Sequence, residues 1–197
     1  MNTRPIDVIR ELYPPGTELH GILVSHSRAV AGRALEIARR LKSLEPDIDF
    51  IEEAALLHDI GIYLTNAPAI GCRGEYPYIC HGILGRQLLE ARGFFRHARV
   101  CECHVGVGLT AEEIRIQQLP LPARDMLPAT LEEEIICYAD KFFSKKWQQN
   151  GRALAFESVL KNIKHYGEAK ASRFLQWAGR FEGVTQAADP VDAGCLQ

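Results

Sequence analysis

The stretch AALLHDIG, residues 54–61, decides how this chain folds, because a histidine and an aspartate stand side by side after an apolar run. Such a pair is unfavourable in a hydrophobic core unless it is hydrogen-bonded or binds a cation. Imidazole nitrogen and carboxylate oxygen are both suitable ligands for divalent transition metals. Gly61 is a typical C-terminal stop for a helix. The segment therefore predicts a helix that ends with two metal ligands, His58 and Asp59.

The sequence on both sides of this stretch has helical patterning. Residues 19–44 carry apolar side chains at a period of 3.6, with arginines between them, as expected of a helix with one buried face. Thr110 with Glu113, and Thr130 with Glu133, match the capping box that begins a helix. We expect helices over residues 6–13, 19–44, 49–61, 79–91, 95–104, from 111, from 131, and over 152–166 and 168–181. Strand-like alternation is not evident, so the sequence predicts an all-α fold.

Length and composition predict a single domain. The chain has 197 residues, enough for one hydrophobic core. Its hydrophobic content of 47% and charged content of 24% are ordinary for a globular protein. The motifs lie within a core of residues 19–144, and the helices of residues 152–181 complete a domain over 1–182. Residues 183–197 are poor in apolar side chains and are expected to form a loose tail. Between the helices, residues 63–78 are rich in proline and glycine and predict a loop.

Charge and cysteine usage restrict the partners and the compartment. A formal net charge of −2 gives no basic surface for nucleic acid. The apolar runs are far shorter than the roughly 20 residues that span a bilayer. The first ten residues lack the hydrophobic stretch of a signal peptide, and the six cysteines lack zinc-ribbon spacing. We therefore expect a cytoplasmic protein with reduced thiols and with neither nucleic-acid nor membrane partners.

Four other residues have the same character as the His-Asp pair, being polar groups placed among apolar neighbours at helical spacing. His26 lies four residues from apolar positions on either side, and Asp140 lies four residues after Ile136. Since residues three and four apart share a helix face, these side chains point toward the core. A single histidine in such a place is more often a hydrogen-bonded core residue. All six together predict a metal site: His26, His58, Asp59, His81, His104 and Asp140.

The order of these residues resembles that of the HD-domain superfamily of metal-dependent phosphohydrolases. The segments that carry the resemblance are HSR at 26–28, ALLHDIG at 55–61, HG at 81–82, HVGVGLT at 104–110 and LEEEIICYADK at 131–141. The chain resembles most closely the small stand-alone HDIG proteins. It is also similar to the bacterial dinucleoside-tetraphosphate hydrolases, which carry two irons. The resemblance implies an HD-type helical bundle.

The resemblance also implies two divalent transition-metal ions, iron or manganese. The first ion would have four ligands: His26, His58, Asp59 and Asp140. The second would be held by three residues that are also the expected catalytic residues: the bridging Asp59, His81 and His104. This ligand set implies a dinuclear centre, because relatives with only the first four ligands tend to hold one metal.

One position departs from the pattern of the superfamily. Many relatives carry a basic residue directly after the HDIG motif, where it can contact phosphate, but this chain has Ile62 there. Three other cations are therefore expected to contact the substrate: Arg28, Arg73 and Lys141. The first lies near His26, the second in the following loop, and the third beside the last ligand.

The function implied by the resemblance is hydrolysis of a nucleotide or a related small phosphoester. Two cations about 3.5–4 Å apart can hold a water and activate it as a hydroxide nucleophile. Two alternatives stay open at this point. A di-iron oxygenase of the same superfamily would use the same six ligands, and a regulatory module would bind a nucleotide without turnover.

Overall fold

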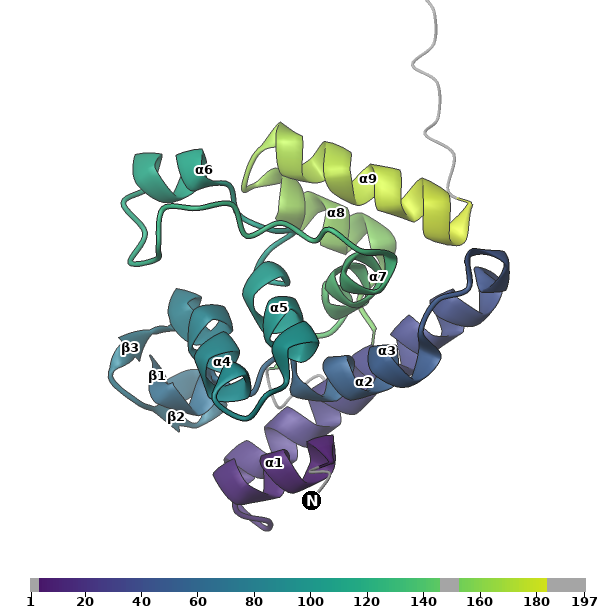
Figure 1. The fold of residues 1–197 in the computed structure, drawn as a ribbon. Coiled ribbons are helices and arrows are strands. Elements are labelled where there is room, and N and C mark those ends of the chain that lie inside the picture. Colours follow the sequence, from purple (N-terminus) through teal and green to yellow (C-terminus); the bar gives the residue numbers. More distant parts are fainter. Residues whose placement is uncertain (1–3, 146–152, 184–197) are drawn as a thin grey trace, which may run out of the picture.

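The computed structural model describes residues 4–145 and 153–183, and these are mainly helical (Figure 1). The described α-helices are α1 Pro5–Leu12, α2 Glu18–Arg40, α3 Ile48–Leu57, α4 His81–Glu90, α5 Phe95–Cys103, α6 Ala111–Ile116, α7 Leu131–Asp140, α8 Phe156–Lys164 and α9 Glu168–Glu182. The all-α prediction is confirmed. None of these helices combines the length and the apolar character that crossing a membrane requires. Almost all of the expected tail, from residue 184 on, lies outside the described residues.

A small sheet lies where the sequence predicted only a loop. Its strands are β1 Thr65–Ala67, β2 Cys72–Arg73 and β3 Tyr76–Pro77, in the order β2-β1-β3. Strand β1 is antiparallel to β2 and parallel to β3. Strands of two or three residues are too short to show the alternation by which a strand is found in a sequence. The sheet joins the His-Asp turn to α4.

Helix α3 begins one residue earlier and ends four residues earlier than the sequence predicted. Its N-cap is Asp47, whose carboxylate accepts a hydrogen bond of 3.1 Å from the backbone N–H of Phe50, so Asp49 lies inside the first turn. The helix ends before His58, and the residues from there to Gly61 form a turn. The two central candidate ligands are therefore carried by the turn after α3.

The two capping boxes differ in the structure. At α6, Thr110 accepts from the N–H of Glu113 at 3.1 Å, and the Glu113 carboxylate accepts from the N–H of Thr110 at 2.8 Å. At α7, Thr130 accepts from the N–H of Glu133 at 3.3 Å, but the Glu133 carboxylate accepts from Ala129 instead, at 2.7 Å. Both helices begin where the motif predicted, although only the first box is complete.

Two hydrophobic clusters lie on either side of the candidate ligands. The larger joins α2, α3 and α7 to the C-terminal helices and includes Val30, Ile37, Ile51, Ile135 and Phe174. The smaller joins α1 and α2 to the His-Asp turn, α4 and α5, and includes Ile9, Leu23, Leu57, Ile60 and Leu89. Each fully buried aliphatic side chain contributes about 1.5–3 kcal/mol. The long helix α2 contributes to both clusters, so it fixes the two halves of the bundle around the site.

Helix α1 anchors the His-Asp turn through Tyr13, which is 1% exposed. The Tyr13 hydroxyl donates to the carbonyl oxygen of Ile60 at 2.7 Å and accepts from the N–H of Tyr63 at 3.3 Å. One buried hydroxyl thus binds backbone groups on both sides of Gly61. This places the turn against the smaller hydrophobic cluster.

Candidate metal centre

Five helices bring the six candidate ligands to one place. His26 lies in the middle of α2, whereas the other five lie at or just beyond helix ends. All six are buried, with at most 7% of each residue exposed: His26, His58, Asp59, His81, His104 and Asp140. Each therefore points inward, as its spacing from apolar neighbours predicted.

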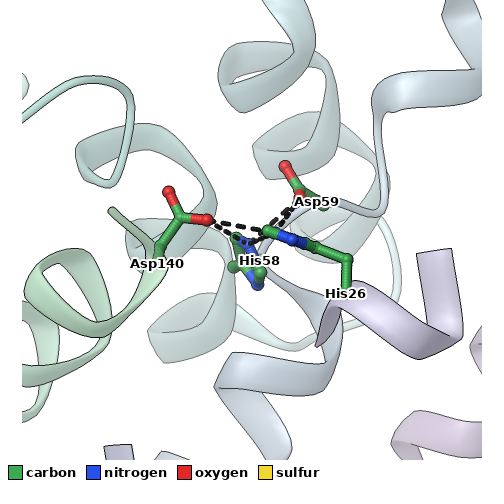
Figure 2. A group of neighbouring side chains, drawn as sticks. All are labelled: His26, His58, Asp59 and Asp140. Carbon is green, nitrogen blue, oxygen red and sulfur yellow. Dashed lines mark hydrogen bonds and ion pairs between the residues drawn. The ribbon is translucent and has the colours of Figure 1, made fainter. Parts of the chain in front are cut away.

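Four of these residues form a compact first cluster (Figure 2). The Nε2 atom of His26 lies 3.1 Å from Asp59 Oδ2 and 3.0 Å from Asp140 Oδ1. The Nε2 atom of His58 lies 3.1 Å and 3.4 Å from the same two oxygens, and 3.3 Å from the Nε2 of His26. Ligands about 2.1 Å from one ion lie about 3.0–3.4 Å from one another in octahedral or tetrahedral geometry. The four atoms have the spacing of a single coordination sphere.

The second cluster uses the other oxygen of Asp59. Asp59 Oδ1 lies 3.4 Å from the Nε2 of both His81 and His104, and these two nitrogens lie 3.1 Å apart. Asp59 therefore presents Oδ2 to the first group and Oδ1 to the second. This is the arrangement of a carboxylate that bridges two ions.

Backbone hydrogen bonds set the tautomer of three of the rings. The Nδ1 atoms of His58, His81 and His104 lie 2.7, 2.7 and 2.8 Å from the carbonyl oxygen three residues earlier in the chain. A carbonyl oxygen only accepts, so each Nδ1 donates, and the Nε2 of the neutral ring presents a lone pair. These lone pairs face carboxylate oxygens and one another. The donor set therefore fits a bound cation.

The pKa shifts of the histidines agree with a site built for cations. Burial lowers the pKa of His81 to about 3 and also lowers the pKa of His104, so both rings are neutral ligands. Burial acts in the same direction on His58, but Asp59 and Asp140 outweigh it and raise the pKa of His58 to about 9. A proton thus substitutes for a metal at His58, and metal binding there releases it.

Two lysines neutralise the carboxylates. Lys145 Nζ lies 2.7 Å from Asp59 Oδ2, and Lys141 Nζ lies 2.7 Å from Asp140 Oδ2. Burial raises the pKa of both aspartates, but neighbouring positive charges outweigh it and hold each pKa well below its usual range. Lys141 was predicted from the sequence, whereas Lys145 was missed. Lys145 lies beyond the end of α7, so helical spacing gave no signal for it.

Close backbone contacts bring the two clusters together. A Cβ atom at Gly61 would lie 2.3 Å from the carbonyl oxygen of His81, so the glycine lets the His-Asp turn lie directly against α4. A Cβ atom at Gly82 would lie 2.5 Å from the carbonyl oxygen of Cys101, so this glycine lets α4 approach α5. Both contacts are needed to bring His81 beside the residue that follows α5, His104.

Three of the six ligands border a cavity of about 270 Å³ that is also lined by the two lysines. Its lining residues are Tyr78, Ile79, His81, His104, Val105, Gly106, Asp140, Lys141 and Lys145. The other two expected substrate contacts lie elsewhere: Arg28 is exposed on α2 and Arg73 is exposed on β2, and neither lines this cavity. Their substrate contacts stay predictions from the sequence.

The fold and the His-Asp clusters define an HD domain. Residues 23–144 match the family model for the HD domain, and the chain belongs to this family. An uncharacterised protein of Methanocaldococcus jannaschii is 37% identical over 143 residues, which are 70% of this chain and 77% of that protein. No solved structure matches the chain significantly.

Two similar proteins carry a functional name. The tRNA (cytidine(56)-2′-O)-methyltransferase of Thermoplasma volcanium is 30% identical over 81% of this chain. The protein of the same name from Picrophilus torridus is 36% identical over 65% of the chain. The matched regions are only 41% and 34% of these two relatives. The chain therefore spans well under half the length of both.

Proposed function

We propose that this protein is a metal-dependent phosphohydrolase that acts on a nucleotide or related phosphoester. The observation that carries the proposal is the double cluster around Asp59, which adjoins a cavity with two lysine side chains. The ligand atoms suit two divalent cations, and the ammonium groups suit an anionic substrate. Membership of the HD domain family supports the same reaction class.

Each group at the site has a distinct role in this proposal. With two divalent ions bound, such a centre supplies a water of lowered pKa and neutralises charge on phosphoryl oxygens. Asp59 would contribute one oxygen to each of the two ions, and His81 and His104 would hold the second ion. Lys141 and Lys145 orient the phosphoryl group in the cavity. The hydrogen bonds at Nδ1 keep the rings in position, so little reorganisation accompanies substrate binding.

The names of the two tRNA methyltransferases do not lead us to propose methyl transfer. The matched part is less than half of each of those proteins. The formal net charge of −2 also differs from the basic surface typical of tRNA binding. We therefore propose a small phosphoester as the substrate of this chain.

The test is phosphate release with and without oxygen. Manganese-loaded protein is incubated with nucleoside monophosphates, dinucleotides and simple phosphate esters, both in air and under argon. A hydrolase forms its products equally in both atmospheres, phosphate from monoesters or nucleotides from dinucleotides, because the reaction needs water and no electron transfer. The Asp59→Asn variant, purified in parallel, is the control for contaminating phosphatases. Turnover that requires iron and consumes oxygen would instead identify the protein as an oxygenase. Binding of a nucleotide without turnover would identify it as a regulatory module.

A further inference from the structure

A second cavity, of about 450 Å³, adjoins the metal-bearing cavity. The two cavities share four lining residues: Ile79, Val105, Gly106 and Lys141. Two of these follow candidate ligands directly in the chain, since Val105 comes after His104 and Lys141 after Asp140. A group in the second cavity is therefore held in a defined position relative to the metal ligands.

The walls of this second cavity are mostly apolar. They come from the segment after α5, from the end of α6 and from α8, and include Val107, Leu109, Leu119, Val159 and Ile163. A volume of this size lies within the roughly 300–1,000 Å³ typical of small-molecule sites. Phosphate has no affinity for such walls, so they suit the organic part of a phosphoester.

The polar side chains at this cavity are few, and only some of them are free to hydrogen-bond a ligand. Lys170 is already satisfied, because its Nζ donates to the carbonyl of Gly108 at 2.8 Å and pairs with Glu113 at 2.8 Å. The amides of Gln117 and Asn162 are exposed and make no hydrogen bond within residues 4–145 and 153–183. Each free amide offers both a donor and an acceptor to a ligand.

An exposed aromatic ring completes the lining. Tyr166, just beyond α8, is 70% exposed although it is a large side chain beside an apolar cavity. Tyrosine faces stack on planar heteroaromatic rings, and such stacking is largely independent of the identity of the base. An alkyl chain would use the apolar walls but neither the stacking face nor the two amides.

We propose that this cavity binds a nucleobase, so that the substrate is a nucleotide with its base between α6 and α8 and its phosphate at the lysines. The proposal rests on the proposed function and specifies its substrate class. Apolar walls and Tyr166 contact the faces of the base, and Gln117 and Asn162 pair with its edge. The two adjoining cavities then accommodate the two chemically different ends of one molecule.

The first test compares the binding of ligands that carry the base alone, the base with a phosphate, or a phosphate without the base. Adenosine, AMP, ribose 5-phosphate and octyl phosphate are titrated into manganese-loaded protein by calorimetry. We expect Tyr166→Ala to weaken adenosine and AMP binding roughly tenfold, because one base stack is lost, and to leave ribose 5-phosphate binding unchanged. Tyr76→Ala is the matched control, since Tyr76 is also an exposed tyrosine, at 50%, and lines neither cavity.

A second pair of variants tests the location of the site. Asn162→Trp fills the cavity from an exposed position on α8, and Ser158→Trp places the same side chain on the same helix away from the lining. The proposal expects adenosine binding to be lost only in the first. Adenosine binding at wild-type strength in both Tyr166→Ala and Asn162→Trp overturns it, as does octyl phosphate binding more tightly than AMP. Because adenosine binding needs no turnover, failure of hydrolysis alone would refute the proposed reaction and not the base site.

Discussion

The Nε2 atoms of His81 and His104 lie 3.1 Å apart, although both rings donate their Nδ1 protons to backbone carbonyls. Two neutral rings held in this way direct lone pairs at each other. The third atom of the group, Asp59 Oδ1, lies 3.4 Å from each nitrogen and is an acceptor as well. Three converging acceptors are stable together only around a cation. This group therefore has the character of a second metal site.

We expect His81→Ala to lower the metal content from two ions per chain to one. The substitution removes a ligand of the second cluster and leaves the four ligand atoms of the first in place. Elemental analysis after loading with iron or manganese under reducing conditions measures the change. His20→Ala, a histidine outside both clusters, is the control. If the His81→Ala variant still bound two ions per chain, His81 would be a packing residue and not a metal ligand.

The stability of the fold should depend on metal through Asp59. A ligand that binds only the native state at 100 times its dissociation constant stabilises the fold by about 2.7 kcal/mol. The melting temperature of the wild type should therefore fall when a chelator is added. In Asp59→Asn this difference should disappear, because the bridging carboxylate belongs to both clusters. Differential scanning calorimetry with and without EDTA measures it. A chelator effect of wild-type size in the variant would contradict the bridging role.

Much of this site follows from local sequence patterns. The helical spacing between each candidate ligand and its apolar neighbours predicted that the ligand side chain points inward. This prediction needs only local sequence, because residues three and four apart lie on the same face of a helix. The pairing of Asp59 Oδ1 and Oδ2 with different histidines is not local, because it depends on how α4 and α5 pack beside the turn. Helical spacing therefore could not divide the ligands into two groups, and only the resemblance to the superfamily implied that division.

The features that the sequence did not predict have identifiable reasons. Asp47 and Asp49 are both suitable N-caps two residues apart, and the backbone conformation selects the first. Strands β1, β2 and β3 are held by pairing with one another, and that information is spread over residues 65–77. Lys145 lies beyond the end of α7, where the helical pattern no longer places a side chain.

Gly61→Ala should disturb both stability and metal binding. The added methyl group meets backbone atoms of α4, the carbonyl of His81 at 2.3 Å and the nitrogen of Gly85 at 2.5 Å, which cannot rotate away. Overpacking of this kind costs typically about 1–3 kcal/mol. Chemical denaturation and metal analysis measure the two effects. Gly32→Ala in α2 is the matched control, because nothing lies within 4 Å of its added Cβ, and alanine favours a helix by about 1 kcal/mol. Equal stabilities of the two variants would refute the proposed close contact.

Lys145→Met should change metal affinity and substrate affinity in opposite directions. Lys145 Nζ lies 2.7 Å from Asp59 Oδ2, so its positive charge competes with a cation for the same carboxylate. Removal of this charge should tighten metal binding, measured by competition with a metal-chelating dye. The same variant loses a charged hydrogen bond to phosphate, which is worth about 1.5–3 kcal/mol, and KM should rise at least roughly tenfold.

Two comparison variants separate this role from a general effect of charge. Lys161→Met removes a positive charge from an exposed position on α8 that lines neither of the two cavities, and it should leave both constants unchanged. Arg73→Ala tests the contact predicted from the sequence; from its exposed position on β2 we expect a smaller rise in KM than for Lys145→Met. If Arg73→Ala raised KM more than Lys145→Met, the phosphate contact would be assigned to the segment between the His-Asp turn and α4. Unchanged metal affinity and KM in Lys145→Met would reduce Lys145 to a structural counter-ion of Asp59.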